Sequence, residues 1–141
     1  MKFFIASPWK NKEEVESLTK KLRSKGHEVS SFIESGANLL TGHPIEDHMK
    51  LFSEALKNWR EDEHVSKIFN SELEILKQSD VVVLLLPAGI SSHLEAGIAH
   101  GWGKKSVLIG PIAKPEIVYL IFDKIYLDTS SFLKDLDSLA S

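Results

Sequence analysis

The chain has 141 residues, 43% of them hydrophobic, which predicts one folded domain and excludes a disordered chain. Its 20 acidic and 17 basic residues give a net charge of −3, a balance that argues against a nucleic acid polymer as a partner. The absence of cysteine excludes disulfides, thiolate nucleophiles and iron–sulfur clusters.

The apolar runs of the chain are short. The longest continuous one, Val81–Leu86, is far below the roughly 20 residues that cross a bilayer. The N-terminal run Met1–Ala6 is too short for the apolar core of a secretory signal, and Ser7 and Pro8 interrupt it. We therefore expect a cytoplasmic protein without a membrane-spanning segment.

The N-terminal part of the chain predicts two strands around one helix. Lys2–Ala6 is an apolar segment typical of a buried strand. Apolar residues at spacings of three and four predict an amphipathic helix over Asn11–Lys25, which Gly26 ends. His27–Ile33 predicts a second strand, and Glu34–His43, with two glycines and little periodicity, predicts a loop.

The middle of the chain predicts helical segments that lead to a central strand. Pro44 can open a helix whose apolar face runs over Ile45–Trp59. After a charged break at Arg60–Glu63, the same period continues over Val65–Leu76. Asp80–Leu86 is apolar on both faces, which is typical of a central strand in a parallel sheet.

The C-terminal part continues the alternation of helices and strands, which brings the number of predicted strands to five. Its elements are a helix over Ser91–Trp102, a strand over Lys105–Gly110, a short helix or irregular segment over Glu116–Phe122, a strand over Ile125–Leu127 and a final helix capped by Asp128 or Thr129.

This alternation predicts an α/β fold. We expect a flavodoxin-like, Rossmann-like three-layer sandwich with a five-stranded parallel sheet, in the order 2-1-3-4-5. Ligands of such sheets bind outside the carboxyl ends of the strands, at the switch point between the first and third strands. Ser7–Asn11 and Pro87–Glu95 would lie at that point.

The segment after the predicted central strand carries the strongest functional signal. It opens a helix, so its backbone N–H groups would face the switch point and attract an anion. Glu95, one turn into this helix, could act as a nucleophile or a base. The same residues allow a structural interpretation, because Ser92 and Glu95 have the spacing of a capping box. The two roles do not exclude each other.

Other chemistry-bearing residues are weaker signals. Trp9 follows the first strand, where its indole could stack on a base, and Glu72 lies on the long helix, either solvated or facing the active edge of the sheet. Gly97 and Gly101 are expected to permit close packing of a helix on the sheet. Because no two histidines have i, i+4 spacing, we expect no metal site. His93 stands out by its closeness to the candidate glutamate.

Four motifs stand in a characteristic order and spacing: Phe3–Pro8, Phe69–Leu73, Ser79–Val83 and His93–Ala99. Together they resemble the nucleoside 2-deoxyribosyltransferase superfamily, which includes the 2′-deoxynucleoside 5′-phosphate N-hydrolases. The resemblance runs from Lys2 to about Gly110. It implies a single nucleoside 2-deoxyribosyltransferase-like domain over residues 1–141.

The resemblance implies an enzyme that cleaves the N-glycosidic bond of a nucleoside or nucleotide, by hydrolysis or by transfer. Glu95, followed by alanine and glycine, matches the nucleophile, which attacks the anomeric carbon, displaces the base and forms a covalent glycosyl-enzyme. Glu72 matches the second carboxylate, which protonates or orients the base. Ser91 and Ser92 match the serines that bind the 5′-phosphate in the hydrolase branch.

The other residues predicted to bind substrate are Ser7, Trp9, Gly89 and His93. Gly89 takes the place of an acidic residue that transferases use to bind base or sugar. Ser7–Asn11 lacks the tyrosine that holds the nucleophile in transferases, so hydrolysis is favoured over transfer.

Two other functions fit the same sequence. One is a TIR-like NAD glycohydrolase, which shares the five-stranded fold and the helix glutamate. The other is a non-catalytic nucleotide-binding module in which Glu95 only caps the helix. In every case we expect a small nucleoside or nucleotide as ligand and no cofactor. The broad apolar face of Ile45–Trp59 predicts a homodimer or higher homo-oligomer, and the resemblance implies that relatives often complete the site with a neighbouring subunit.

Overall fold

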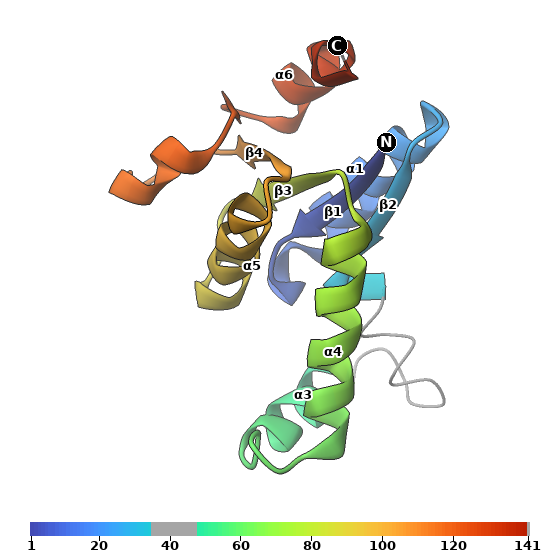
Figure 1. Ribbon diagram of the computed structural model, residues 1–141, viewed down its shortest axis with the longest axis vertical. Helices are drawn as coiled ribbons and strands as arrows, with labels where there is room; N and C mark the ends of the chain where they lie inside the picture. Colours follow the sequence, from blue (N-terminus) through green and yellow to red (C-terminus); the bar gives the residue numbers. More distant parts are fainter. Residues whose placement is uncertain (35–47, 141) are drawn as a thin grey trace.

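The computed structural model describes residues 1–34 and 48–140. The predicted loop beyond Glu34 and the predicted helix start at Pro44 lie outside the described residues. Figure 1 shows the described chain as a sheet with helices on both of its faces.

The described residues form a five-stranded parallel sheet in the order β2-β1-β3-β4-β5, so the predicted order is confirmed. Across four strands, Ser30, Phe4, Val82 and Ser106 lie in one row of Cα partners. Every residue of β3 is buried, as expected for a strand that is covered on both faces. The strands are β1 (Lys2–Ala6), β2 (Glu28–Ser31), β3 (Val81–Leu85), β4 (Lys105–Ile109) and β5 (Lys124–Tyr126).

Helices connect and cover these strands. The longer ones are α1 (Lys12–Ser24), α3 (His48–Leu56), α4 (Glu63–Gln78), α5 (Ile90–Gly101) and α6 (Thr129–Lys134), and the short 3-10 helices are η1 (Trp9–Asn11), η3 (Ile117–Ile121) and η4 (Leu136–Ala140). Asp62 caps α4, because its carboxylate accepts the N–H groups of His64 and Val65 at 2.8 and 3.0 Å. Asp128 caps α6, as predicted, by accepting the N–H group of Ser131 at 2.7 Å.

The second strand is shorter than predicted, because residues 32–34 are helical. Arg23 of α1 fixes this change of direction. Its guanidinium donates to the carbonyl of Val29 at 2.9 Å and to both carboxylate oxygens of Glu34 at 2.9 and 2.8 Å. The strand therefore ends where the chain turns back to this ion pair.

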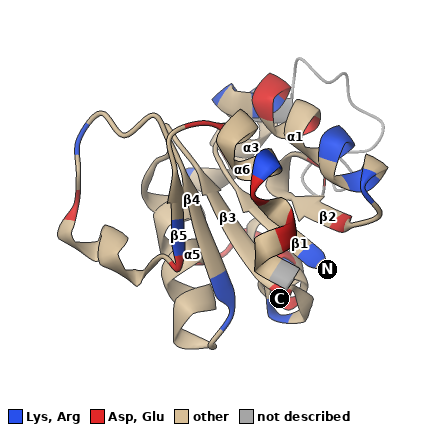
Figure 2. Ribbon diagram, turned by 90° about the horizontal axis from the view of Figure 1, so that it is seen from above, with Lys and Arg blue, Asp and Glu red and all other residues tan. Residues whose placement is uncertain are grey.

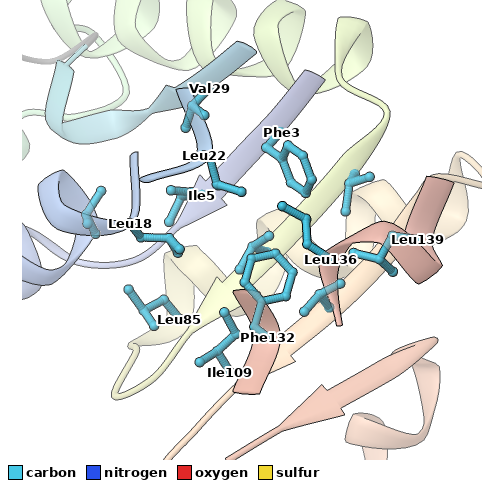
Figure 3. Close-up of a cluster of buried hydrophobic side chains, with 14 of the residues drawn as sticks. Phe3, Ile5, Leu18, Leu22, Val29, Leu85, Ile109, Phe132, Leu136 and Leu139 are labelled. Atoms are coloured by element: carbon cyan, nitrogen blue, oxygen red, sulfur yellow. The ribbon is translucent and has the colours of Figure 1, made fainter. Parts of the chain in front are cut away.

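The hydrophobic core has two parts, one on each face of the sheet. Phe3 and Ile5 of β1 point into one part, and Phe4 and Ala6 point into the other. Figure 3 shows the first part, where side chains of α1 and of the C-terminal helices pack on the strands. The second part lies between the strands and the helices α4 and α5, and Phe122 closes it. The predicted three-layer arrangement is therefore confirmed.

Glycine follows the ends of two helices, of which the end at Gly26 was predicted. Gly26 follows α1 with φ 88°, and Gly103 follows α5 with φ 74°. The expected role of Gly97 and Gly101 is wrong, because a Cβ atom at either position would meet nothing within 4 Å. The side of α5 that packs on the sheet instead carries Ala96 and Ala99, both buried.

Two features of the surface bear on function. The N-terminal half of α4 extends past the sheet, with α3 beside it (Figure 1). The first turn of α1 carries Glu13 and Glu14 and its last turn carries Lys21 and Arg23, so both signs of charge lie on this helix (Figure 2). Within the described ranges, every helix is too short or too polar to cross a membrane.

Candidate functional site

A buried hydrogen-bond network joins the carboxyl ends of β1 and β3. The hydroxyl of Ser7 donates to the carbonyl of Leu85 at 2.9 Å. The side-chain amide of Asn11 donates to the Ser7 hydroxyl at 2.9 Å and to the carbonyl of Pro87 at 2.6 Å. The two loops of the predicted switch point are therefore tied together, and the hydroxyl of Ser7 is engaged by the protein.

The helix α5 begins without a side-chain cap. Its N-cap is Gly89, which has no side chain to accept a hydrogen bond from the first turn. The predicted capping box of Ser92 and Glu95 is wrong, because a capping serine must precede the first helical residue and Ser92 is the third residue of α5. Glu95 therefore lies inside the helix, free of the structural role that competed with chemistry.

Glu95 and Glu72 are the two predicted catalytic residues, and the structure brings them together. Glu95 lies on α5 and Glu72 on α4, which contacts α5. Both side chains are half-buried, and Oε2 of Glu72 is buried from solvent. Burial, assisted by the negative charge of Glu72, raises the pKa of Glu95 from 4.5 to about 8. The two carboxylates thus form an electrostatically coupled pair, an arrangement typical of acid–base and nucleophilic sites.

The predicted serines lie beside this pair on the first turn of α5. Ser91 is exposed, and Ser92 is buried on the same helix face as Glu95, three residues before it. The first-turn N–H groups and the exposed Ser91 together form a surface that can bind an anion.

His93 and Gly89 border a separate hollow. This hollow has a volume of 860 Å³ and lies between α5 and the segment that contains η3, with Gly97 and Tyr119 among its lining residues. Neither Glu95 nor Glu72 lines it. His93 is two residues from Glu95, roughly 200° around the helix axis, so it lies on the opposite side of α5. The structure therefore does not place the His93 side chain with the carboxylate pair.

Trp9 is less exposed than expected. It lies in η1, packs against the first part of the core, and its ring is 5.6 Å from the ammonium group of Lys12. Over residues 1–34 and 48–140, no group of three or more His, Asp or Glu side chains could hold a metal ion.

Two further residues were missed by the sequence analysis. Asn11 was placed at the switch point and at a helix start, but its burial and its hydrogen bond to Pro87, which make it a bridge between the two loops, were not predicted. Tyr119 lies in an apolar run, where nothing in the sequence indicates that its hydroxyl lies 2.9 Å from Nε2 of His93.

The raised pKa of Glu95 predicts a pH-dependent stability. Between pH 4.5 and about 8 the folded protein retains a proton that the unfolded chain releases, so the free energy of unfolding should fall as pH rises, by roughly 1 kcal/mol per pH unit. Glu95→Gln lacks this proton. Urea unfolding across this range should show the variant gaining stability relative to the wild type, with the difference levelling off above about pH 8.

Glu74→Gln is the matched control, since it removes an exposed carboxylate of α4. Its unfolding curves should run parallel to those of the wild type. Parallel curves for Glu95→Gln as well would contradict the raised pKa.

No family model and no curated protein matches the chain. Two solved structures are similar to it over nearly their whole length. One is a 2-deoxyribosyltransferase from Bacillus psychrosaccharolyticus, with a TM-score of 0.71 and 19% identity, covering 94% of this chain and 90% of that one. The other is the CMP N-glycosidase BcmB from Clostridium botulinum, with a TM-score of 0.57 and 19% identity, covering 97% and 99%.

The parallel sheet and the order of its strands agree with the fold that the sequence motifs implied. The chain therefore shares its α/β fold with a 2-deoxyribosyltransferase and with a CMP N-glycosidase.

Proposed function

We propose that this protein, as a single domain of this type, cleaves the N-glycosidic bond of a nucleoside or nucleotide, with Glu95 as the nucleophile. The observation that carries the proposal is the electrostatically coupled pair of Glu95 on α5 and Glu72 on α4. Its support comes also from the fold, which is shared with a 2-deoxyribosyltransferase and a CMP N-glycosidase.

The pair has the groups that a two-step reaction needs. Two coupled carboxylates that hold one proton between them supply one ionised oxygen and one acid. Because the proton of the pair rests on Glu95 at neutral pH, the first step begins with its transfer to Glu72. The carboxylate of Glu95 then attacks the anomeric carbon, the bond to the base breaks, and Glu72 gives the proton to the leaving base. In the second step water attacks the anomeric carbon, Glu72 accepts a proton from it, and Glu95 leaves as a carboxylate.

The substrate is a small nucleoside or nucleotide, without a cofactor. For a 5′-phosphate, the candidate partners are the exposed hydroxyl of Ser91, the uncapped N–H groups of the first turn and the adjacent Ser92. Hydrolysis is favoured over transfer, because transferases hold the nucleophile with a tyrosine hydroxyl in this segment. Here Ser7 has the one side-chain hydroxyl among residues 7–11, and this hydroxyl donates a hydrogen bond to the carbonyl of Leu85.

A homo-oligomer is part of the proposal. The face formed by α5 and η3 carries five large apolar side chains that are between 60% and 88% exposed: Ile90, Leu94, Ile117, Val118 and Leu120. Each of these side chains has on the order of 100 Å² of apolar surface, so their summed area matches the largest apolar patch of a typical monomer. It is about half of the area that one partner buries in a standard interface. A second copy of the chain is the proposed occupant.

The nucleophile assignment predicts the behaviour of Glu95→Gln. The variant should lose on the order of 10³-fold or more in the release of free base, because the covalent step has no carboxylate. Base release would be measured by chromatography across nucleosides, their 5′-monophosphates and NAD, with Glu74→Gln as the control that keeps wild-type rates. A folded Glu95→Gln protein with an unchanged rate would overturn the assignment, as would a wild type inactive on the whole panel.

The coupling between the carboxylates predicts the behaviour of Glu72→Gln. In the wild type, kcat/KM should fall as pH rises past an apparent pKa near 8, because the pair then loses the one proton that the leaving base needs. Glu72→Gln removes both the acid and the neighbouring negative charge, so this falling limb of the pH profile should disappear. A limb that stays in place would show that Glu72 does not act on Glu95.

The interface predicts the effect of Leu120→Lys on assembly. A charge in the middle of the apolar face should convert the oligomer to monomer in sedimentation velocity. Trp59→Lys, in the turn between α3 and α4, is the matched control, since Trp59 is also exposed. Dissociation by Trp59→Lys alone would move the interface to the helix that the sequence analysis selected.

A further inference from the structure

The carbonyl of Gly89 is held by the residue one turn ahead of it in the chain. It accepts the backbone N–H of His93 at 3.3 Å, as the first hydrogen bond of α5. It also lies 2.7 Å from Nδ1 of the His93 ring. The ring of His93 therefore folds back onto the N-cap of its own helix.

Tyr119 holds the other side of the same ring. Its hydroxyl lies 2.9 Å from Nε2 of His93, and the two rings are stacked with centroids 5.8 Å apart. A carbonyl can only accept, so Nδ1 of His93 carries the proton and donates it to Gly89. In the neutral ring Nε2 then accepts, and the hydroxyl of Tyr119 donates to it. Burial raises the pKa of Tyr119, which keeps this hydroxyl protonated.

Tyr119, from which this chain of hydrogen bonds starts, is held in place by the core. The ring of Tyr119 meets the ring of Phe122 edge-on at 6.0 Å, and Phe122 is buried in the second part of the core. On the opposite side of the loop, Asn11 holds the carbonyl of Pro87. The loop between β3 and α5 is thus held from the β1 side by Asn11 and from the η3 side by His93 and Tyr119.

The orientation of the Gly89 carbonyl matters because the peptide bond is planar. In a trans peptide the C=O of Gly89 and the N–H of Ile90 point in opposite directions, so fixing one fixes the other. Gly89 has no side chain to restrict its backbone or to cap the helix. The direction of the first free N–H group of α5 therefore depends on contacts made to the carbonyl.

We propose that Tyr119 is a positioning residue that acts through His93 on the Gly89–Ile90 peptide, and so sets the affinity of the first turn of α5 for the phosphate of a substrate. The proposal rests on the proposed function for its substrate. In this proposal His93 positions the Gly89–Ile90 peptide from the side of α5 away from Glu95, and it does not contact the reacting atoms.

Tyr119→Phe tests the proposal, because it removes the hydroxyl and keeps the stacked ring. With the 5′-monophosphate that the protein cleaves, KM should rise about 3- to 10-fold, the effect of one neutral hydrogen bond, while kcat changes less than about twofold. Tyr126→Phe is the matched control, since its hydroxyl donates to Asp135 at 2.7 Å in a contact remote from α5. It should leave KM unchanged. A parallel loss of kcat and thermal stability in Tyr119→Phe, without a change in KM, would overturn the proposal.

A second readout does not depend on turnover. Nitrogen-15 NMR of the wild-type ring should show His93 with its proton on Nδ1, and Tyr119→Phe should show a mixture of tautomers and a shifted Ile90 amide resonance. Titration with inorganic phosphate should show weaker binding in Tyr119→Phe by the same 3- to 10-fold. If no nucleotide is cleaved but these changes occur, the proposed function fails and the positioning role stands. An unchanged tautomer and an unchanged Ile90 resonance would overturn the positioning role.

Discussion

The free-energy cost of burying the carboxylate of Glu95 against the sheet is the constraint on which the rest of the site depends. Ala96 and Ala99 bring α5 close to the strands, and the same packing removes water from Glu95. The charge of Glu72 on α4 adds to that cost, so the pair is held in a state with a raised pKa. The burial of the apolar sheet stabilises the fold enough to offset this local loss of stability. The proposed chemistry uses the raised pKa that comes with it.

The fold was predictable where one physical signal dominates. The apolar run of β3 requires cover on both faces, and with the regular alternation of helices it leads to the observed strand order. Helix ends at Gly26 and Asp128 followed from local chemistry. The end of β2 did not, because it depends on Arg23 reaching Glu34 across the turn, a contact between side chains eleven residues apart.

The candidate site was predictable only in part, for a geometrical reason. The face that a helical residue presents depends on where the helix sits against the sheet. The sequence indicates that Glu95 and Glu72 are near the switch point, but it does not show that Gly97 and His93 turn away from the sheet. The contacts of Asn11 and Tyr119 are equally hidden, because each joins loops that meet only in the folded sheet.

The hydrogen bond from Ser7 to Leu85 spans 78 residues, and that from Asn11 to Pro87 spans 76. Both depend on β1 pairing with β3. This pairing closes a long loop, so its conformational entropy is lost before the contacts between the strands stabilise the chain. The switch-point loops therefore have no native geometry in a partly folded chain. Folding and the assembly of the site are consequently one cooperative event, and a substitution that slows the meeting of β1 and β3 delays both together.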